Sequence, residues 1–337
     1  MKRFLVQNGF VLGILGTVAL AWADPGIGSR DGPLPVGVLK AVGIFGVFFF
    51  QGLSLPFEEL RRGAANCRLH LCVQGTTFVF FPLAVAAGLA LFSGWLDQPD
   101  LRAGFLYLSF LPSTIASALA LSGVARRNVS SSLLNKTLSN GVGVFLVPFL
   151  CIAWIGGGSA GGPLPVGPVL LGIFLKIILP LLLGQAGRSF AGAWAARHRP
   201  AIRRFANGVI LFIVYAAFCD SFRRDVWTDV EPVALGITGT GVAILLLAAT
   251  GFSWLLSGRA GLDAPSRATA LFCGSQKTLA VGLPLSVMIF GAEESGFELG
   301  VLIVPLLLYH PAQLVLHGWI APRLAAKRTA VGSVAKD

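Results

Sequence analysis

Residues 266–290 read SRATALFCGSQKTLAVGLPLSVMIF, an apolar run that is interrupted at Gly274-Ser275-Gln276-Lys277-Thr278. The run is long enough to cross roughly 30 Å of hydrocarbon as a helix. A helix is favoured because a backbone in lipid must satisfy its own hydrogen bonds. Lys277 lies near the middle of the run, where an ionised side chain costs about 3 kcal/mol or more. We therefore expect a membrane-spanning helix whose break serves a function.

The rest of the chain shares this apolar character. Its 337 residues are 55% hydrophobic and only 12% charged, which is too little charge to cover the surface of a soluble protein. The five cysteines show no spacing typical of zinc or redox motifs, so neither a metal nor another cofactor is expected. We predict an all-α membrane protein with ten transmembrane helices, at residues 4–23, 35–55, 69–93, 103–124, 129–155, 165–187, 203–219, 232–257, 266–290 and 299–321.

Positive charge is distributed unevenly between the two sides of these helices. With the N-terminus placed inside, eighteen lysines and arginines fall in inner segments and four in outer loops. Because inner loops of membrane proteins are enriched in Lys and Arg, we expect both termini in the cytoplasm. The same distribution accounts for the net charge of +11 without a nucleic-acid partner. The sequence does not indicate an oligomeric state.

The first segment allows a second interpretation. Lys2 and Arg3, the apolar stretch after them and Ala21-Trp22-Ala23 imitate a secretory signal with a cleavage site. Removal of that signal would leave nine helices. We retain the segment as a helix because the internal symmetry of the chain requires it.

Two pairs of short sequences indicate a duplicated half. Residues 143–150 (GVFLVPFL) match residues 300–307 (GVLIVPLL), and residues 11–15 (VLGIL) match residues 170–174 (LLGIF). The pairs lie in segments five and ten and in segments one and six, which fits two halves of five helices. Because five is odd, the second half enters the membrane inverted, as in many transporters. We expect a single transmembrane domain over 1–337, with inverted repeats at 1–155 and 165–322 and a cytoplasmic tail at 323–337.

The fourth and ninth segments carry the residues that interrupt helices. Residues 111–117 (LPSTIAS) and 273–278 (CGSQKT) combine proline or glycine with small polar side chains. They hold corresponding places in the two halves, and broken helices in such places mark transporter binding sites. The alternative is a pair of kinked packing helices rich in small residues. The candidate substrate- or ion-binding residues are Ser113, Thr114, Ser117, Ser132, Asn135, Lys136, Ser275, Gln276, Lys277 and Thr278, with Gln74, Thr77, His310 and Gln313 as further candidates.

Lys277 has no acidic residue within the predicted spans to pair with. Backbone carbonyls at the break could hold its ammonium, the amine could be neutral and titrate during transport, or an anionic substrate could supply the counter-charge. Lys136 lies closer to the cytoplasmic end of its segment and could extend to that surface. His310 is either a structural hydrogen-bonding residue or a proton relay.

These motifs resemble the bile acid:sodium symporter superfamily, in its SBF-like branch, over nearly the whole chain. The residues that carry the resemblance are 50–56 (FQGLSLP), 111–114 (LPST), 272–279 (FCGSQKTL) and 305–311 (PLLLYHP). The resemblance implies a panel of segments 1, 2, 6 and 7 and a core of segments 3–5 and 8–10, in which broken helices four and nine cross. It also implies organic anions such as bile acids as substrates, moved together with sodium.

The sequence departs from the sodium-coupled members at the ligands that the resemblance implies. Phe272 stands where those members have a glutamate, and Ser117-Ala118 replaces a Ser-Asn pair. Lys136 replaces a threonine, and Thr77 falls where a glutamine is expected. Since two ammonium groups accompany the loss of oxygen ligands, we expect one or both lysines to replace bound cations. Sodium coupling would then be altered or absent, and proton coupling stays open.

We therefore expect a secondary transporter of a small organic anion that works by alternating access in a bacterial inner membrane. Its partners would be the lipid bilayer and its substrate. An enzyme is not expected, because the predicted spans contain no paired acids, no histidine–acid cluster and no nucleophile–base set. The alternative is a channel or a regulatory membrane protein without transport activity, and saturable counterflow would separate a carrier from both.

Overall fold

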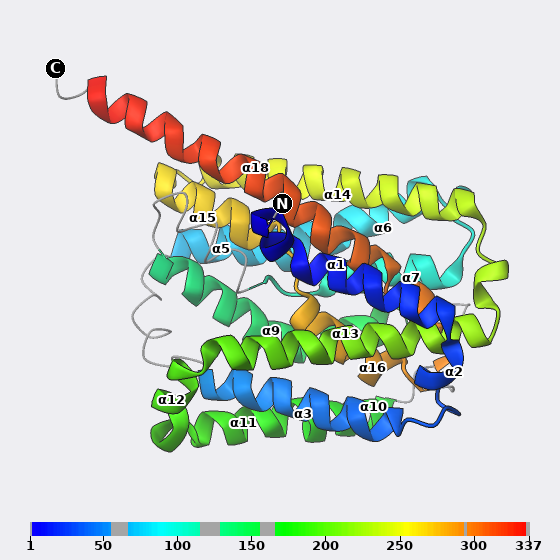
Figure 1. Cartoon of the computed structure of the whole chain (residues 1–337). Coiled ribbons are helices and arrows are strands. Elements are labelled where there is room, and N and C mark those ends of the chain that lie inside the picture. Colours follow the sequence, from blue (N-terminus) through cyan, green and yellow to red (C-terminus); the bar gives the residue numbers. More distant parts are fainter. Residues whose placement is uncertain (1, 55–66, 115–128, 156–165, 293–294, 335–337) are drawn as a thin grey trace.

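The computed structural model describes residues 2–54, 67–114, 129–155, 166–292 and 295–334. This part of the chain is helical and contains no β-strand (Figure 1). Its α-helices are α1 (Lys2–Ala23), α2 (Pro25–Gly28), α3 (Val36–Ser54), α5 (Cys67–Gly75), α6 (Phe81–Leu91), α7 (Pro99–Phe110), α9 (Val129–Trp154), α10 (Val166–Ile173), α11 (Leu179–Ala186), α12 (Arg188–Arg197), α13 (Arg199–Arg223), α14 (Pro232–Arg259), α15 (Ala264–Gly274), α16 (Leu279–Phe290), α17 (Leu299–Leu302) and α18 (Val304–Val334). The short π-helices η1 (Thr76–Phe80) and η2 (Phe174–Ile178) and the 3₁₀ turn η3 (Val226–Thr228) complete the set.

Within the described ranges, six helices are long and apolar enough to cross a membrane. They are Val36–Ser54, Cys67–Leu91, Thr137–Trp154, Arg199–Arg223, Pro232–Arg259 and Leu299–Leu324. The number rises to seven if the pair Leu170–Ala186 and Arg188–Arg197, which bends by 94°, is one span, and Gly9–Ala23 is a shorter apolar helix. Each of the ten predicted segments contains helix, while the ten-span inverted arrangement stays a prediction.

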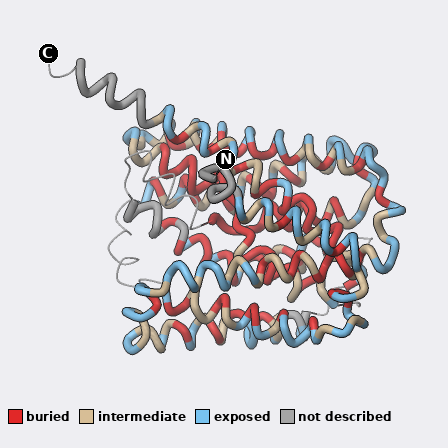
Figure 2. The backbone as a smooth tube through the Cα atoms, in the orientation of Figure 1, coloured by how far each residue is buried: buried red, intermediate tan, exposed pale blue. Residues whose placement is uncertain are grey.

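Large apolar side chains cover the outward faces of these helices. Figure 2 shows exposed residues along the outside of the bundle and buried residues in its interior. Phe190 is 92% exposed, Leu91 78% and Trp22 73%. So much exposed apolar surface is unfavourable in water and suited to lipid. The chain is an integral membrane protein.

The helices form two groups. In the first, α11 packs against α3, and α13 packs against α1, α2 and α3. In the second, α14 packs against α15 and α18, and α7 packs against α6, α9 and α18 (Figure 1). Close approach in the first group depends on glycine, because a Cβ on Gly184 would collide with the carbonyl oxygen of Phe49. The groups contain the segments expected for the panel and for the core.

The predicted interruption of the ninth segment is present, and in the fourth segment the part before residue 115 is described. The helix of the fourth segment, α7, ends at Phe110, and residues 111–114 are not helical. The ninth segment is divided into α15 and α16 by residues 275–278. The backbone N–H of Thr278 donates to the carbonyl oxygen of Pro112 at 3.0 Å. The two breaks therefore meet, although these segments lie far apart in the sequence.

The third segment contains the π-helical turn η1, in which the Phe81 N–H donates to the carbonyl oxygen of Thr76, five residues back. In this register, the Thr77 carbonyl would need the N–H of residue 82. That residue is Pro82, which has no N–H. The Thr77 carbonyl is thus available to a side chain from another helix.

Candidate functional site

Lys277 lies in the unwound segment between α15 and α16, and its side chain is fully buried. Its Nζ donates hydrogen bonds to three backbone carbonyl oxygens, those of Thr77 at 3.0 Å, Ser109 at 2.7 Å and Leu111 at 2.7 Å. The same atom lies 3.9 Å from the centre of the Phe81 ring, in a cation–π arrangement. We refer to the three oxygens as the carbonyl seat.

The carbonyl seat exists because two helices are interrupted beside it. Ser109 and Leu111 lie at the end of α7, where the last carbonyls of a helix have no partner within the helix. The dipole of α7 also places partial negative charge at this end, which favours a cation. The third oxygen is the one that η1 leaves available before Pro82. Each member of the seat therefore follows from a local break in helical bonding.

The hydrogen bonds of Lys277 match its charged form. An ammonium has three N–H donors and no acceptor, and the carbonyl seat offers three acceptors. A neutral amine would have two donors and would leave one carbonyl unmatched. Of the three arrangements open from the sequence, these contacts fit the first, in which backbone carbonyls at the break hold the side-chain nitrogen, and the charge that it carries stays a prediction.

Gln313 in α18 holds the backbone of the unwound segment. Its Oε1 accepts a hydrogen bond from the Lys277 N–H at 2.8 Å, and its Nε2 donates to the Lys277 carbonyl oxygen at 2.8 Å. One side-chain amide thus replaces both backbone hydrogen bonds that a continuous helix would supply. Its Nε2 also lies 2.9 Å from Nδ1 of His310. Of the two further candidates, Gln313 thus holds the backbone of the unwound segment, and His310 contacts Gln313.

Two tyrosines that the sequence analysis did not single out also support the break. The hydroxyl of Tyr309 donates to the carbonyl oxygen of Ser275 at 2.7 Å, and that of Tyr107 donates to the carbonyl oxygen of Gly282. Both side chains are fully buried. The sequence could have indicated these two residues, because a tyrosine in an apolar span needs a hydrogen-bond partner for its hydroxyl.

His317 is a further residue that the sequence analysis missed. Its Nε2 lies 3.2 Å from Ser275 Oγ and 3.3 Å from Thr250 Oγ1, and its Nδ1 lies 3.1 Å from Gln276 Nε2. It follows Gln313 by four residues, which places both on one face of α18 and could have indicated its role. The side chains of Ser275 and Gln276, two predicted binding residues, therefore contact another side chain of the protein, that of His317.

A second polar cluster joins α5 to α9. Asn135 Oδ1 lies 2.8 Å from Nδ1 of His70, and the Asn135 carbonyl oxygen accepts a hydrogen bond from Gln74 Nε2 at 3.3 Å. Gln74 Oε1 in turn accepts from Ser139 Oγ at 2.9 Å. The structure thus brings together two of the predicted residues, Gln74 and Asn135, on neighbouring core helices.

Ser113 presents a hydroxyl at the end of α7 that is buried and has no hydrogen-bond partner among the described residues. Its carbonyl oxygen accepts from Asn140 Nδ2 at 3.2 Å, which ties the break to α9. Thr114 is buried beside it. An unmatched buried hydroxyl is costly unless a ligand or water completes it. The predicted Ser117 and the side chains of Ser132 and Lys136 lie outside the described residues.

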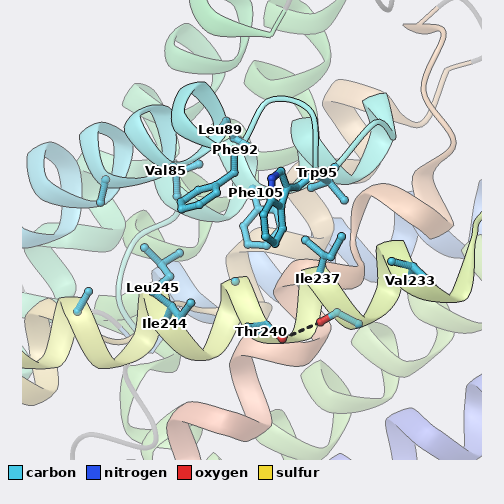
Figure 3. A pocket seen from close by; sticks show the side chains of 16 residues that line it. Val85, Leu89, Phe92, Trp95, Phe105, Val233, Ile237, Thr240, Ile244 and Leu245 are labelled. Atoms are coloured by element: carbon cyan, nitrogen blue, oxygen red, sulfur yellow. Dashed lines mark hydrogen bonds between the residues drawn. The ribbon is translucent and has the colours of Figure 1, made fainter.

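A large apolar groove lies away from these residues, between α6, the loop after it, α7 and α14 (Figure 3). Its volume is about 690 Å³. The side chains around it include Val85, Phe92, Trp95, Phe105 and Ile237. Such a lining cannot replace the water that an anion loses on binding. We therefore take the carbonyl seat and its neighbours, and not the groove, as the candidate site.

The model of the SBF-like CPA transporter family matches residues 8–326. The chain belongs to this family. It is 34% identical to Uncharacterized protein PA2026 of Pseudomonas aeruginosa over 97% of this chain and 95% of that protein. It is 30% identical to Sodium/bile acid cotransporter 7 of Xenopus tropicalis, over 95% of this chain and 92% of that protein. The protein of the same name from Mus musculus is 28% identical, over 94% and 92% of the two chains.

Family membership makes the chain a bile acid:sodium symporter-like membrane transporter and not an enzyme. The structure shows what occupies the place where the family resemblance implied a sodium-binding glutamate. Phe272 is fully buried there, packed with Ala268, Leu271 and Ala321, and its ring meets that of His317 at 5.5 Å. An apolar aromatic ring has no oxygen atom, so residue 272 cannot serve as a sodium ligand.

Proposed function

We propose that this member of the SBF-like CPA transporter family carries a small organic anion across the bacterial inner membrane by alternating access. In this proposal the ten segments form two inverted repeats, and the core moves against the panel. Family membership, the contact between the end of α7 and the break in the ninth segment, and the polar residues around that contact support it. The excess of inner lysines and arginines supports a cytoplasmic location for both termini.

The observation that carries the proposal is the position of Lys277 Nζ on the carbonyl seat. Sodium is bound in proteins by oxygen atoms, and unwound carbonyls and helix C-terminal ends provide them in transporters. Here three such oxygens surround a lysine Nζ at 2.7–3.0 Å. We infer that Lys277 acts as a tethered cation in place of a bound sodium ion. Transport would then proceed without sodium, in contrast to what the names of the vertebrate relatives say of those proteins.

Since Lys277 uses all three of its donors on the carbonyl seat, it has none left for a substrate. We therefore assign recognition of the anion to the opposite side of the crossing, where α7 ends beside α9. Ser113 and Thr114 offer hydroxyl groups there, and Lys136 on α9 would supply positive charge. The unpartnered hydroxyl of Ser113 supports this assignment.

The test is counterflow of a labelled anion in proteoliposomes, after a thermal-shift screen of organic acids on the purified protein. A carrier gives saturable uptake that unlabelled substrate on the opposite side accelerates. Flux that rises linearly with concentration would indicate a channel, and the absence of flux for every stabilising acid would indicate a regulatory protein. Ser113→Ala should raise the half-saturation concentration, while Ser286→Ala, a buried serine on α16 whose hydroxyl donates to the Leu283 carbonyl, serves as the control.

A further inference from the structure

The orientation of the Gln313 side-chain amide is fixed by the backbone of Lys277. A backbone N–H can only donate a hydrogen bond, and a backbone carbonyl oxygen can only accept one. Oε1 of Gln313 must therefore face the Lys277 N–H, and Nε2 must face the Lys277 carbonyl oxygen, each at 2.8 Å. We call this pair of hydrogen bonds the amide clamp. Turning the amide by half a rotation would place donor against donor and acceptor against acceptor.

The amide clamp determines which nitrogen of the His310 ring carries a proton. Nε2 of Gln313 has two hydrogens, and one of them goes to the Lys277 carbonyl oxygen. The other points to Nδ1 of His310, 2.9 Å away. Nδ1 therefore accepts a hydrogen bond and carries no proton, so the ring is neutral and its proton lies on Nε2.

A proton on Nδ1 would be incompatible with the amide clamp. It would turn the acceptor that faces the second Gln313 hydrogen into a donor. The Lys277 carbonyl oxygen also lies within hydrogen-bonding reach of the ring, so the new N–H would compete with Gln313 for that oxygen. Gln313 is fully buried and His310 is only 8% exposed. In such a place a donor left without an acceptor is costly, so protonation favours opening of the clamp.

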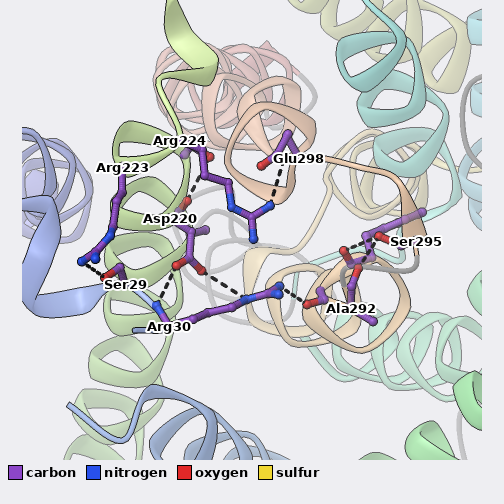
Figure 4. Close-up of polar contacts among 12 residues, drawn as sticks. Ser29, Arg30, Asp220, Arg223, Arg224, Ala292, Ser295 and Glu298 are labelled. Carbon is purple, nitrogen blue, oxygen red and sulfur yellow. Dashed lines mark hydrogen bonds and ion pairs between the residues drawn. The ribbon is translucent and has the colours of Figure 1, made fainter. Parts of the chain in front are cut away.

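The surroundings of the His310 ring do not compensate a positive charge. Among the described residues, no charged side chain interacts with the ring. Phe10 of α1 contacts it edge-on, with ring centroids 6.0 Å apart. Two ion pairs, Arg30–Asp220 and Arg224–Glu298, lie at the α2 end of the bundle (Figure 4).

The other titratable residues of the helices around the ring have partners of their own, lie near a helix end or lie outside the description. They are Lys277 on the carbonyl seat, Tyr107 and Tyr309 on backbone carbonyls, His317 beside Ser275, Asp100 and Arg102 in the first turn of α7, Arg259 at the end of α14, Arg323 over Trp319, and Lys2 and Arg3 of α1, whose side chains lie outside the described residues.

We propose that His310 is a proton-binding site whose occupation releases the amide clamp. The proton binds when the clamp opens, because the clamped ring offers Nδ1 only as an acceptor. Opening then frees the backbone of Lys277 and with it the segment between α15 and α16. Below the ordinary titration range of histidine, at about pH 6.5, opening should become about tenfold more favourable for each unit by which the pH falls.

The position of His310 links this proton to the movement of the two helix groups. The ring belongs to α18 in the second group, and Phe10, which covers its edge, belongs to α1 in the first. Movement of the core against the panel would separate the two rings and admit water to His310. This link rests on the proposed function, whereas the proton site itself does not.

Hydrogen exchange of the Lys277 backbone N–H, followed by mass spectrometry on the purified full chain in detergent, tests the proposal. His310→Asn keeps an acceptor near the position of Nδ1 but binds no proton in this range. Wild type and variant are compared at the same pH, so the intrinsic pH dependence of exchange cancels. They should exchange alike at about pH 8, and at about pH 5.5 wild type should exchange about tenfold faster than the variant.

Two further variants complete the experiment. His310→Leu removes the acceptor, so the Lys277 N–H should exchange faster than in wild type at about pH 8, where histidine is neutral. His198→Gln is the control, because His198 lies at the end of α12 and its Nδ1 contacts the Trp194 carbonyl oxygen. Its pH profile should equal that of wild type.

Two results would overturn the proposal. One is the same dependence of exchange on pH in wild type and in His310→Asn, whatever the absolute rates, since the ring would then support the clamp by packing alone. The other is wild-type protection of the Lys277 N–H in His310→Leu at about pH 8. Neither measurement requires a substrate, so a failure here is distinguishable from a failure of the proposed transport.

Discussion

Replacing Lys277 with methionine removes the cation from the carbonyl seat while nearly preserving the volume of the side chain. The oxygens of Thr77, Ser109 and Leu111 then lose their donor. At about 1 kcal/mol or more for each buried group left without a partner, the folded state should lose about 3 kcal/mol of stability. The cation–π contact with Phe81 adds to this loss. At about 2 °C per kcal/mol, the unfolding temperature should fall by roughly 6 °C or more.

Thermal unfolding of the purified protein in detergent measures this loss, and Lys176→Met provides the matched control. Lys176 lies on η2 with an exposed side chain, so its replacement should leave the unfolding temperature almost unchanged. A Lys277→Met variant as stable as the control would show that the three carbonyls do not need the ammonium. The reasoning from hydrogen-bond geometry to a tethered cation would then be refuted.

A smaller replacement tests what the carbonyl seat prefers to bind. Lys277→Ala leaves the three oxygens with an open space in front of them. If the seat suits a cation, sodium should raise the unfolding temperature of this variant in a saturable way. Wild type, in which the seat is filled, should not respond. Equal responses of wild type and variant to sodium and potassium chloride would reflect ionic strength alone and would contradict the idea.

Three further outcomes follow from the structure. Gln313→Leu removes both hydrogen bonds to the Lys277 backbone and should cost about 2 kcal/mol or more in thermal unfolding. Gly184→Val should destabilise the protein because its side chain would collide with the backbone of α3, whereas Gly172→Val, with open space around it, should have a much smaller effect. Burial, together with the negative charge of Glu298, raises the pKa of Asp100 to about 6. The hydrogen bond from the Glu298 N–H lowers this pKa but does not cancel the rise. The folded state therefore binds the proton of Asp100 more tightly than the unfolded chain does. The stability that this proton contributes is present at low pH and is lost as the pH rises through about 6. Chemical unfolding at several pH values should show this dependence, and Asp100→Asn should remove the dependence.

The helical class and both helix breaks could be predicted from the sequence because they depend on local features. Apolar runs, prolines and clustered small polar residues determine where a membrane helix forms and where it stops. The break at residues 275–278 is confirmed, and α7 ends at Phe110, just before Pro112. For the site, the sequence predicts only which polar residues lie at those breaks. The part that most of these residues play in binding stays a prediction.

The bonding of the site could not be predicted because it joins residues far apart in the chain. Lys277 reaches the carbonyl of Thr77, 200 positions away, and that oxygen is available only because a π-turn precedes Pro82. Backbone atoms carry no residue identity, so a sequence pattern does not reveal them as ligands. The same applies to His317, whose contacts with Ser275 and Gln276 occupy side chains that the sequence pattern assigned to a ligand.

The most direct test of the tethered cation is anion counterflow in proteoliposomes prepared entirely without sodium, compared with the same assay in saturating sodium. An ammonium that takes the place of a coupling ion predicts equal initial rates in the two conditions. It also predicts that an imposed sodium gradient drives no accumulation. Counterflow that requires sodium, or uphill uptake on an inward sodium gradient, would contradict the role assigned to Lys277.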